Sequence, residues 1–401
     1  AEQKTMPVRN KIDTIAMTAI LPENEYVAEL IKEMPGLTNP NLAKKGKVKT
    51  KHHIETIGPP VYCRPRPMSK EKFDICKELI KKNLDSGICR RGSGRYASPA
   101  HIVPKGKSGW RLVGDYRRLN AQTVPDRYPV PCLRDFTRNL AGCTMFSKVD
   151  LLHAFHQIEN DESSIEKTAL ALPWGLLESL KLPMGLSNSG QSFQRLMDEL
   201  FFEIPFVFVY IDDLLIASKD EEEHKIHIKK VLEILERHGI LINLDKCKFF
   251  QEKLEYLGHT ITPTGIRPLA EKVEAISAFE EPEIESQLRR FLGMVNFYHR
   301  FIRNCAGILA PLHGLIKENK KKSRARVKWT PEARKAFVEI KEALVNATEL
   351  EHPKAGAQLS LQVDASDVAI GAVLNQTKDA RTAPLAFKKK NIPTEKEYTV
   401  F

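Results

Sequence analysis

Two adjacent aspartates, Asp212 and Asp213, lie between an apolar run at residues 205–210 and another at residues 214–218. Two apolar runs with polar residues only at their junction are typical of a β-hairpin whose tip carries the carboxylates. Like charges a few ångströms apart repel and raise each other's proton affinity, so such a pair requires a compensating charge. Mg²⁺ suits this role, because it prefers hard carboxylate oxygens and takes its other ligands from substrate phosphates.

A third carboxylate, Asp150, ends another apolar run at residues 145–151. Successive side chains of a strand point to opposite faces, so Asp212 and Asp213 are not expected to face one metal site together. A strand beside the hairpin would bring Asp150 next to Asp212, and the three could then hold two ions about 3.5–4 Å apart. The structural alternative is a polar hairpin turn at residues 212–213 and an aspartate at position 150 that caps the following helix.

The rest of the sequence predicts a mixed α/β (α+β) scaffold to position these side chains. Apolar spacing and capping residues predict helices at residues 26–34, 70–86, 220–238, 269–279 and 285–301, and one that begins at residues 330–331. Further apolar segments predict strands at residues 101–104, 110–116, 359–364 and 371–375. Residues 44–53 form a basic run that fits either a solvated linker or a nucleic-acid contact.

Composition narrows the class of protein. At 401 residues the chain exceeds the size of one ordinary core, which predicts two to four subdomains. A net charge of +11 favours a polyanionic partner, although many basic proteins bind no nucleic acid. Seven scattered cysteines, none in a Cys-x-x-Cys pair, argue against a disulfide framework or zinc site and fit a reducing intracellular compartment. The chain has no apolar run of roughly 18 residues, so we expect a soluble protein without a membrane span.

These motifs together resemble the reverse transcriptase of gypsy-type LTR retrotransposons, a family related to the retroviral enzymes. Residues 210–213, Tyr-Ile-Asp-Asp, are similar to the family's Tyr-x-Asp-Asp box, and residues 146–158 resemble the strand that carries its first aspartate. The resemblance extends over approximately residues 55–397, with the motifs in the family's order. It implies a right-hand polymerase fold with fingers, palm and thumb, followed by a connection and a partial RNase H-like segment.

The resemblance also implies a division of the chain into subdomains. We expect an N-terminal arm or linker at residues 1–57, fingers and the start of the palm at 58–145, a palm with the catalytic aspartates at 146–262, a thumb at 263–318, a connection at 319–356 and a partial RNase H-like segment at 357–401.

By the same resemblance, Asp150, Asp212 and Asp213 would be the catalytic residues and the ligands of two Mg²⁺ ions, for which Mn²⁺ can substitute. Phe155 would block a ribose 2′-hydroxyl, and Lys246 occupies the position of the family's candidate proton donor. The expected deoxynucleotide contacts are Lys105, Arg111, Phe155, Met184 and Tyr210, and the expected primer grip is Tyr256, Leu257, Gly258 and His259. The plain alternatives are a core aromatic at Phe155 and solvated charges at Lys105 and Lys246.

Residues 361–374 resemble the start of the family's RNase H domain, in which Asp364 would be the first metal ligand and Glu397 the second. The stretch between residues 387 and 394 is shorter than in the family, and the sequence ends at Phe401. Both features argue against RNase H activity in this chain.

The leading hypothesis is an RNA-directed and DNA-directed DNA polymerase that transfers deoxynucleotides to a primer 3′-hydroxyl. Its partners would be an RNA template, a DNA primer/template duplex and deoxynucleoside triphosphates, and it would act as a monomer or a homodimer. We expect it in the cytoplasm, within a retroelement particle, or in the nucleus. One alternative is a non-catalytic nucleic-acid-binding descendant of such a polymerase, which the altered loop at residues 187–190, the shortened stretch between residues 387 and 394 and the end at Phe401 favour. Another is a nuclease centred on Asp364.

Overall fold

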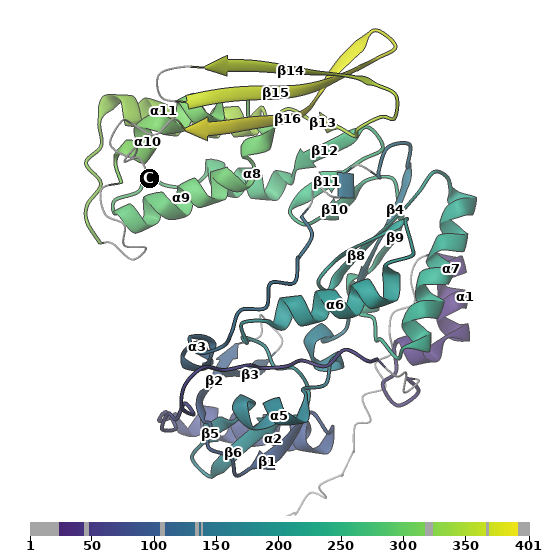
Figure 1. Ribbon diagram of the computed structural model, residues 1–401, viewed down its shortest axis with the longest axis vertical. Coiled ribbons are helices and arrows are strands. Elements are labelled where there is room, and N and C mark those ends of the chain that lie inside the picture. Colours follow the sequence, from purple (N-terminus) through teal and green to yellow (C-terminus); the bar gives the residue numbers. More distant parts are fainter. Residues whose placement is uncertain are drawn as a thin grey trace, which may run out of the picture. The chain divides into compact units, whose positions relative to one another are not determined.

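The computed structural model describes residues 24–43, 48–104, 109–132, 136–137, 139–316, 324–365 and 369–391. The chain divides into two compact units, of which the first contains Ala1–Pro131, Ser147–Ile216 and Lys225–Phe249. The second contains Cys132–Phe146, Ala217–His224 and Phe250–Phe401. Both units combine helices with β-sheets, in agreement with the predicted fold class (Figure 1).

Two sheets lie wholly or mainly in the first unit. A five-stranded sheet has the order β1-β6-β5-β2-β3, and a four-stranded sheet has the order β7-β8-β4-β9. Their strands are β1 (Cys89–Gly92), β2 (Ser98–Pro104), β3 (Trp110–Gly114), β4 (Met145–Asp150), β5 (Leu170–Leu172), β6 (Gly175–Ser179), β7 (Val207–Tyr210), β8 (Asp213–Ser218) and β9 (Lys248–Gln251). The apolar runs predicted around Asp150 and Asp212 are therefore strands of one sheet.

The helical segments of this part of the chain are mostly short. They are α1 (Glu25–Glu33), η1 (Pro35–Leu37), α2 (Lys70–Asp85), α3 (Arg117–Asn120), η2 (Ala154–Gln157), α5 (Glu162–Ile165), η3 (Glu166–Thr168), α6 (Ser189–Phe201), α7 (Glu221–Arg237) and η4 (Leu244–Lys246). The predicted helices at residues 26–34, 70–86 and 220–238 are confirmed as α1, α2 and α7. The Ser69 hydroxyl caps α2 by accepting a hydrogen bond from the Lys72 amide.

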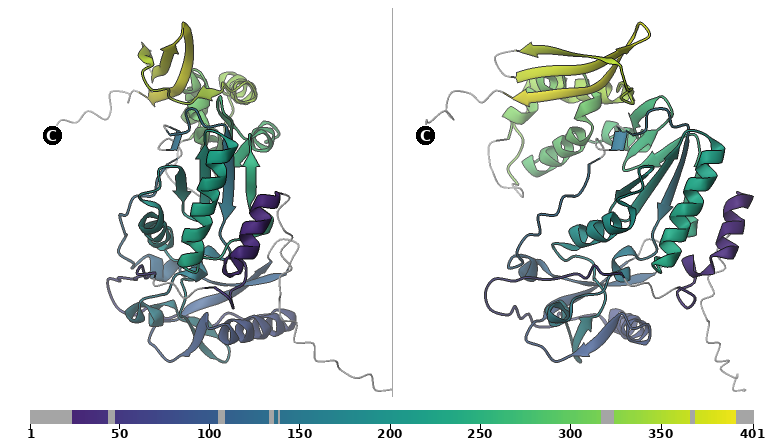
Figure 2. Two further views of the ribbon diagram at one scale, coloured as in Figure 1. Left: turned by 90° about the vertical axis from the view of Figure 1, so that its right-hand side faces the viewer. Right: turned by 45° about the vertical axis from the view of Figure 1, so that its right-hand side comes forward.

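Helix α7 shows why its prediction succeeded. The side chains of Ile228, Val231, Leu232 and Leu235 are fully buried, and their spacing places them on one helical face. The helix ends before Gly239, which has a φ of 68°. Residues with a side chain rarely adopt this left-handed conformation, so glycine suits the end of the helix. In both views of Figure 2, α7 runs alongside the four-stranded sheet.

The end of the basic run at residues 44–53 is part of the folded unit. The His52 amide donates to the Glu159 carbonyl at 2.8 Å, and its Nδ1 lies 2.8 Å from the Ser192 hydroxyl. The His52 side chain is buried, so this residue is no solvated linker. Residues 44–47 of the run lie outside the described residues.

The second unit is built from helices and two small sheets. Its helices are α8 (Ala270–Ser277), α9 (Glu285–Phe297), η5 (His299–Phe301), α10 (Cys305–Gly314) and α11 (Pro331–Val345). One sheet joins β10 (Leu254–Tyr256), β11 (His259–Ile261), β12 (Gly265–Pro268) and β13 (Leu350–Glu351), and the other joins β14 (Gln358–Ala365), β15 (Ala369–Lys378) and β16 (Arg381–Asn391). The predicted strands at residues 359–364 and 371–375 are confirmed as β14 and β15. None of the described helices has the length and apolarity to cross a bilayer.

The predicted helix at residues 285–301 is interrupted. Helix α9 ends at Phe297, because Tyr298 leaves the helical conformation with φ −103° and ψ 7°. The Tyr298 hydroxyl donates a hydrogen bond to the Gly258 carbonyl at 2.9 Å, and the turn η5 follows. Apolar spacing did not predict that α9 ends at Phe297, where Tyr298 makes a hydrogen bond to a distant part of the chain.

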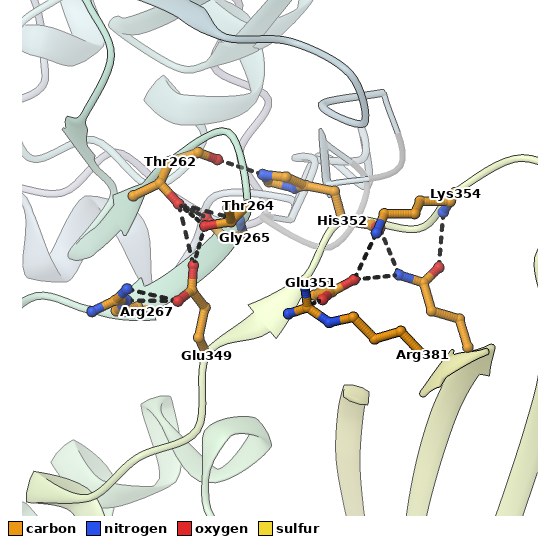
Figure 3. Close-up of polar contacts among 10 residues, drawn as sticks. Thr262, Thr264, Gly265, Arg267, Glu349, Glu351, His352, Lys354 and Arg381 are labelled. Carbon is orange, nitrogen blue, oxygen red and sulfur yellow. Dashed lines mark hydrogen bonds and ion pairs between the residues drawn. The ribbon is translucent and has the colours of Figure 1, made fainter. Parts of the chain in front are cut away.

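Two carboxylates tie the segment around β13 to its neighbours in the second unit (Figure 3). The Glu349 carboxylate accepts hydrogen bonds from Thr262, Thr264 and Arg267, at 3.2, 2.8 and 3.0 Å. This group fixes the β11–β12 turn.

The second carboxylate, Glu351, lies 3.0 Å from the ammonium of Lys354 and 3.0 Å from the guanidinium of Arg381. The Gln376 amide donates to it at 3.3 Å. Glu351 thus connects β13 to the β15–β16 hairpin.

Buried histidines make the stability of the fold depend on pH. Burial lowers the pKa of His52 from 6.5 to about 4, and the same cause lowers the pKa of His156 and His259 to about 4. Each group binds a proton more tightly in the unfolded chain, so stability is fully present above pH 6.5 and is lost as the pH falls towards 4. For one such histidine the loss between pH 6.5 and pH 5 is about 2 kcal/mol.

We therefore expect the free energy of unfolding, measured by urea denaturation, to fall between pH 7 and pH 5. The His52→Gln variant should show a shallower fall, because glutamine binds no proton in this range. An equal slope in the two proteins would contradict the assignment to His52.

Candidate active site

The two aspartates at residues 212–213 lie at the tip of the predicted hairpin. Strands β7 and β8 pair antiparallel, and the pair Tyr210 and Asp213 closes a turn made of Ile211 and Asp212. Ile211 has a φ of 53°. A β-branched residue rarely adopts this conformation, which costs roughly 1–3 kcal/mol and persists only where surrounding contacts hold it. The turn is therefore a strained element with a carboxylate on its second residue.

The third aspartate is brought to the same place by sheet order. Asp150 ends β4 and Asp213 begins β8, and these two strands are neighbours. Burial raises the pKa of Asp150 above its ordinary value, and the charge of Asp213 adds to the effect. Burial also raises the pKa of Asp212, to which Asp213 and Asp150 contribute. The structure thus brings the three predicted carboxylates close enough to feel each other's charge.

A lysine inside this group was missed by the sequence analysis. The ammonium of Lys148 lies 2.6 Å from Oδ1 of Asp213, and the two side chains are only 22% and 23% exposed. Its charge lowers the pKa of Asp150 and of Asp212, against the larger effect of burial. The available signal was its position two residues before Asp150, because side chains at this spacing share one face of a strand.

The predicted proton donor, Lys246, lies at the edge of the group. Its ammonium is 3.9 Å from Oδ1 of Asp150, and its side chain is 67% exposed. At this distance and exposure, the attraction contributes little to stability. Lys246 is thus near the carboxylates and open to solvent.

The carboxylates suit a divalent cation by their chemistry. Asp150, Asp212 and Asp213 supply hard oxygen donors, and the repulsion that raises the pKa of the first two would be relieved by a cation. Within the described part of the chain, no three or more His, Cys, Asp or Glu side chains form a ready-made metal cage. Mg²⁺ needs no such cage, since it commonly keeps one or two carboxylates and substrate phosphates as ligands.

Residues expected to contact the nucleotide are partly brought together. On β3, Nη1 of Arg111 lies 3.3 Å from the Met184 sulfur. Phe155 in η2 packs edge-to-face on Phe193 of α6, with ring centroids 5.8 Å apart. Tyr210 ends β7 and is half-buried. The remaining member, Lys105, lies outside the described residues.

The expected primer grip forms a tight hairpin turn in the second unit. Tyr256 and His259 pair and enclose Leu257 and Gly258, whose φ angles are 47° and 76°. Positive φ at both central residues is the pattern of a type I′ turn, in which glycine is favoured. A side chain at Gly258 would also approach the Tyr298 hydroxyl to 3.3 Å. These constraints give the turn a defined shape.

The two residues expected in an RNase H-like site do not form a described pair. Asp364 lies on β14, paired with Gly371 of β15, and is exposed. Glu397 lies outside the described residues.

Comparisons with known families place this geometry in a class. Residues 103–261 match the family described as reverse transcriptase (RNA-dependent DNA polymerase), and residues 329–401 match the RNase H-like domain found in reverse transcriptase. The first match includes both Asp150 and the hairpin of Asp212.

Curated relatives are polyproteins of transposons. The chain is 34% identical, over 81% of its length, to the retrovirus-related Pol polyprotein from transposon 297 of Drosophila melanogaster, and covers 31% of that protein. It is 32% identical, over 94% of its length, to the Tf2-3 polyprotein of Schizosaccharomyces pombe and covers 28% of it. It is 33% identical, over 93% of its length, to the Pol polyprotein from transposon opus of Drosophila melanogaster and covers 39% of that protein. The chain therefore spans about a third of the length of these relatives.

Solved structures with a similar fold include two foamy viral protease-reverse transcriptases. The one described as dRH, in complex with double-stranded DNA, has a TM-score of 0.80 at 24% identity, covering 92% of this chain and 65% of the other. The one in complex with an RNA/DNA hybrid has a TM-score of 0.78 at 24% identity, and the match covers 93% of this chain and 50% of the other. The chain thus has the polymerase fold of the retroviral reverse transcriptases, with an RNase H-like segment. It belongs to the reverse transcriptase family of LTR retrotransposons and their retroviral relatives, whose members in general use divalent metal ions.

The pairing of Lys148 with Asp213 predicts a measurable coupling. Lys148→Met should lower the free energy of unfolding by roughly 1–3 kcal/mol, because it leaves the partly buried carboxylate of Asp213 without its paired ammonium. In the Asp213→Asn background the same change should cost much less, since the partner charge has been removed. Urea denaturation of the two single variants and the double variant measures the coupling. Additive effects would contradict it, and Lys246→Met, at an exposed site, is the control expected to change little.

Proposed function

We propose that this chain is an RNA-directed DNA polymerase that also copies DNA, and that it transfers deoxynucleotides to a primer 3′-hydroxyl. The observation that carries the proposal is the strained β7–β8 turn, which presents Asp212 and Asp213 beside the strand that ends in Asp150. A simple polar turn does not explain why a third, partly buried carboxylate lies next to this pair. The proposal also accounts for the match of residues 103–261 to reverse transcriptases.

In this proposal Asp150, Asp212 and Asp213 are the catalytic carboxylates. They would hold two Mg²⁺ ions, or Mn²⁺ in their place, which when bound would activate the primer hydroxyl and offset the charge of the leaving pyrophosphate. Lys246 is exposed and 3.9 Å from Asp150, which would let it donate a proton to the pyrophosphate without leaving the site. Lys148 would keep Asp213 oriented before substrate arrives.

The nucleotide would be recognised by its phosphates and its sugar. Arg111, with Lys105, would bind the triphosphate, since a guanidinium suits charge-assisted bidentate contacts with phosphate. Met184 contacts Arg111 and would line the same pocket with Tyr210. Phe155 is braced by Phe193, so its ring could block a 2′-hydroxyl without turning away.

Primer and template would be held by both units. The rigid turn at residues 256–259 would be the primer grip, and the division into arm, fingers, palm, thumb, connection and RNase H-like segment would follow the boundaries expected from the sequence. The partners would be an RNA template, a DNA primer/template duplex and deoxynucleoside triphosphates. This is in line with the double-stranded DNA and RNA/DNA hybrid bound by the foamy viral relatives. The chain would act inside the cell, as a monomer or homodimer.

The Asp212→Asn variant tests the polymerase proposal. Extension of a DNA primer on an RNA template with Mg²⁺ should fall at least about 1,000-fold, because a carboxylate that stabilises the transition state is lost. Template–primer affinity, measured by fluorescence anisotropy, should stay within about threefold, since backbone contacts supply most of it. Asp74→Asn, on the exposed face of α2, is the matched control. Near-normal extension by Asp212→Asn would exclude this site as the catalytic centre.

The Phe155→Val variant tests the proposed sugar recognition. It should raise the efficiency of ribonucleotide relative to deoxynucleotide incorporation at least about tenfold, because the smaller side chain leaves room for a 2′-hydroxyl. Single-nucleotide extension assays give kcat/KM for both substrates. Phe202→Val, at a residue that is 89% exposed, is the control. An unchanged ratio in Phe155→Val would assign Phe155 to the core alone.

A further inference from the structure

A buried glutamine of α6 contacts the backbone of the catalytic hairpin. Gln194 is fully buried, and its Oε1 accepts a hydrogen bond from the Ile211 amide at 2.9 Å. Its Nε2 donates to the Val209 carbonyl at 3.3 Å and to Oδ1 of Asp198 at 2.8 Å. Both ends of the side-chain amide are therefore used, and two of the three bonds go to the chain just before Asp212.

The position of these bonds gives them a specific consequence. Val209 and Ile211 flank Tyr210, so one side chain fixes the orientation of the backbone on both sides of it. Ile211 holds a φ of 53°, which a β-branched residue keeps only where its surroundings impose it. Asp212 is the next residue, so the direction of its carboxylate follows from the conformation of Ile211.

A second layer of contacts orients Gln194 itself. The other oxygen of Asp198 accepts a hydrogen bond from the Tyr128 hydroxyl at 2.7 Å. Burial, together with this hydrogen bond, raises the pKa of Tyr128 to about 12, so the hydroxyl stays protonated as a donor. The Arg195 guanidinium lies 4.5 Å from the Tyr128 ring centroid and pairs with Asp126 at 2.9 Å. Contacts through Asp198 thus connect the loop at residues 126–128 to the hairpin turn.

We propose that Gln194 is a positioning residue, which holds the Ile211 peptide in its strained conformation and thereby aims the Asp212 carboxylate. It acts through the backbone and needs no contact with substrate. The inference depends on the proposed polymerase function for its effect on rate. Its structural content, the restraint on Ile211, can be measured without activity.

The first test is Gln194→Met, which keeps the side-chain length and removes all three hydrogen bonds. In primer extension kcat should fall at least about tenfold, whereas KM for the deoxynucleotide and the Kd for template–primer should stay within about threefold. Amide hydrogen exchange, read by mass spectrometry on peptides covering residues 209–213, should be at least about tenfold faster, because the Ile211 amide loses its acceptor. Gln191→Met, one turn earlier on α6, is the matched control and should leave both readouts near wild type.

The second test exchanges the two functional groups. Gln194→Glu alone keeps an acceptor for Ile211 but removes the donors and sets a carboxylate against Asp198, so it should lower kcat. Combining it with Asp198→Asn restores a donor between the two side chains and leaves an oxygen for Tyr128. The double variant should regain at least about a third of the wild-type kcat together with slow exchange at residues 209–213. Loss of packing alone predicts no such rescue.

The outcomes separate this inference from the proposed function. Wild-type kcat and wild-type exchange in Gln194→Met would overturn the positioning role, and so would a double variant that regains neither. If the wild-type chain fails to extend a primer, the polymerase proposal fails, and exchange at residues 209–213 still decides whether Gln194 restrains the turn. If Gln194→Met does not fold, the comparison of Gln194→Glu with the double variant decides the question.

Discussion

The repulsion between three carboxylates at one edge of a sheet is the constraint on which the site depends. Burial and mutual charge raise the pKa of Asp150 and Asp212, so each would be more stable alone than in this group. A fold that keeps them together needs a compensating cation, and Lys148 supplies one against Asp213. Lys148, together with the exposed Lys246 near Asp150, supplies two positive charges against three carboxylates, so the group remains anionic. This residual negative charge would favour binding of a divalent cation together with its phosphate ligands.

Charge compensation alone does not aim a carboxylate, and the structure uses the backbone for that. The strained φ of Ile211 turns the chain sharply between two strands, and no glycine relieves the strain. Gln194 on α6 holds this peptide from a fully buried position. Lys148 therefore acts on a charge, whereas Gln194 acts on a conformation. The two contacts constrain neighbouring aspartates by independent means.

The sequence predicted what local patterns determine. The two apolar runs that flank residues 212–213 predicted the hairpin, and helical spacing predicted α7. The position of Thr330 before a proline predicted that it caps α11. It did not reveal the lysine in the carboxylate group, because Lys148 pairs across strands with a residue 65 positions away. Gln194 was missed for the same reason, since a glutamine in an amphipathic helix resembles any polar helix residue. Long-range polar partners leave no periodic signal, so only the fold could identify them.

The proposed catalytic residues and the proposed primer grip lie in different units of the chain. Asp150, Asp212 and Asp213 belong to the first unit, and the turn at residues 256–259 belongs to the second. Strand β8 nevertheless begins with Asp213 in the first unit and ends with Ser218 in the second. Through β8, Asp212 and Asp213 are thus covalently joined to the unit that would grip the primer. The local geometry of these two aspartates depends on Lys148 and Gln194, which lie in the same unit as they do.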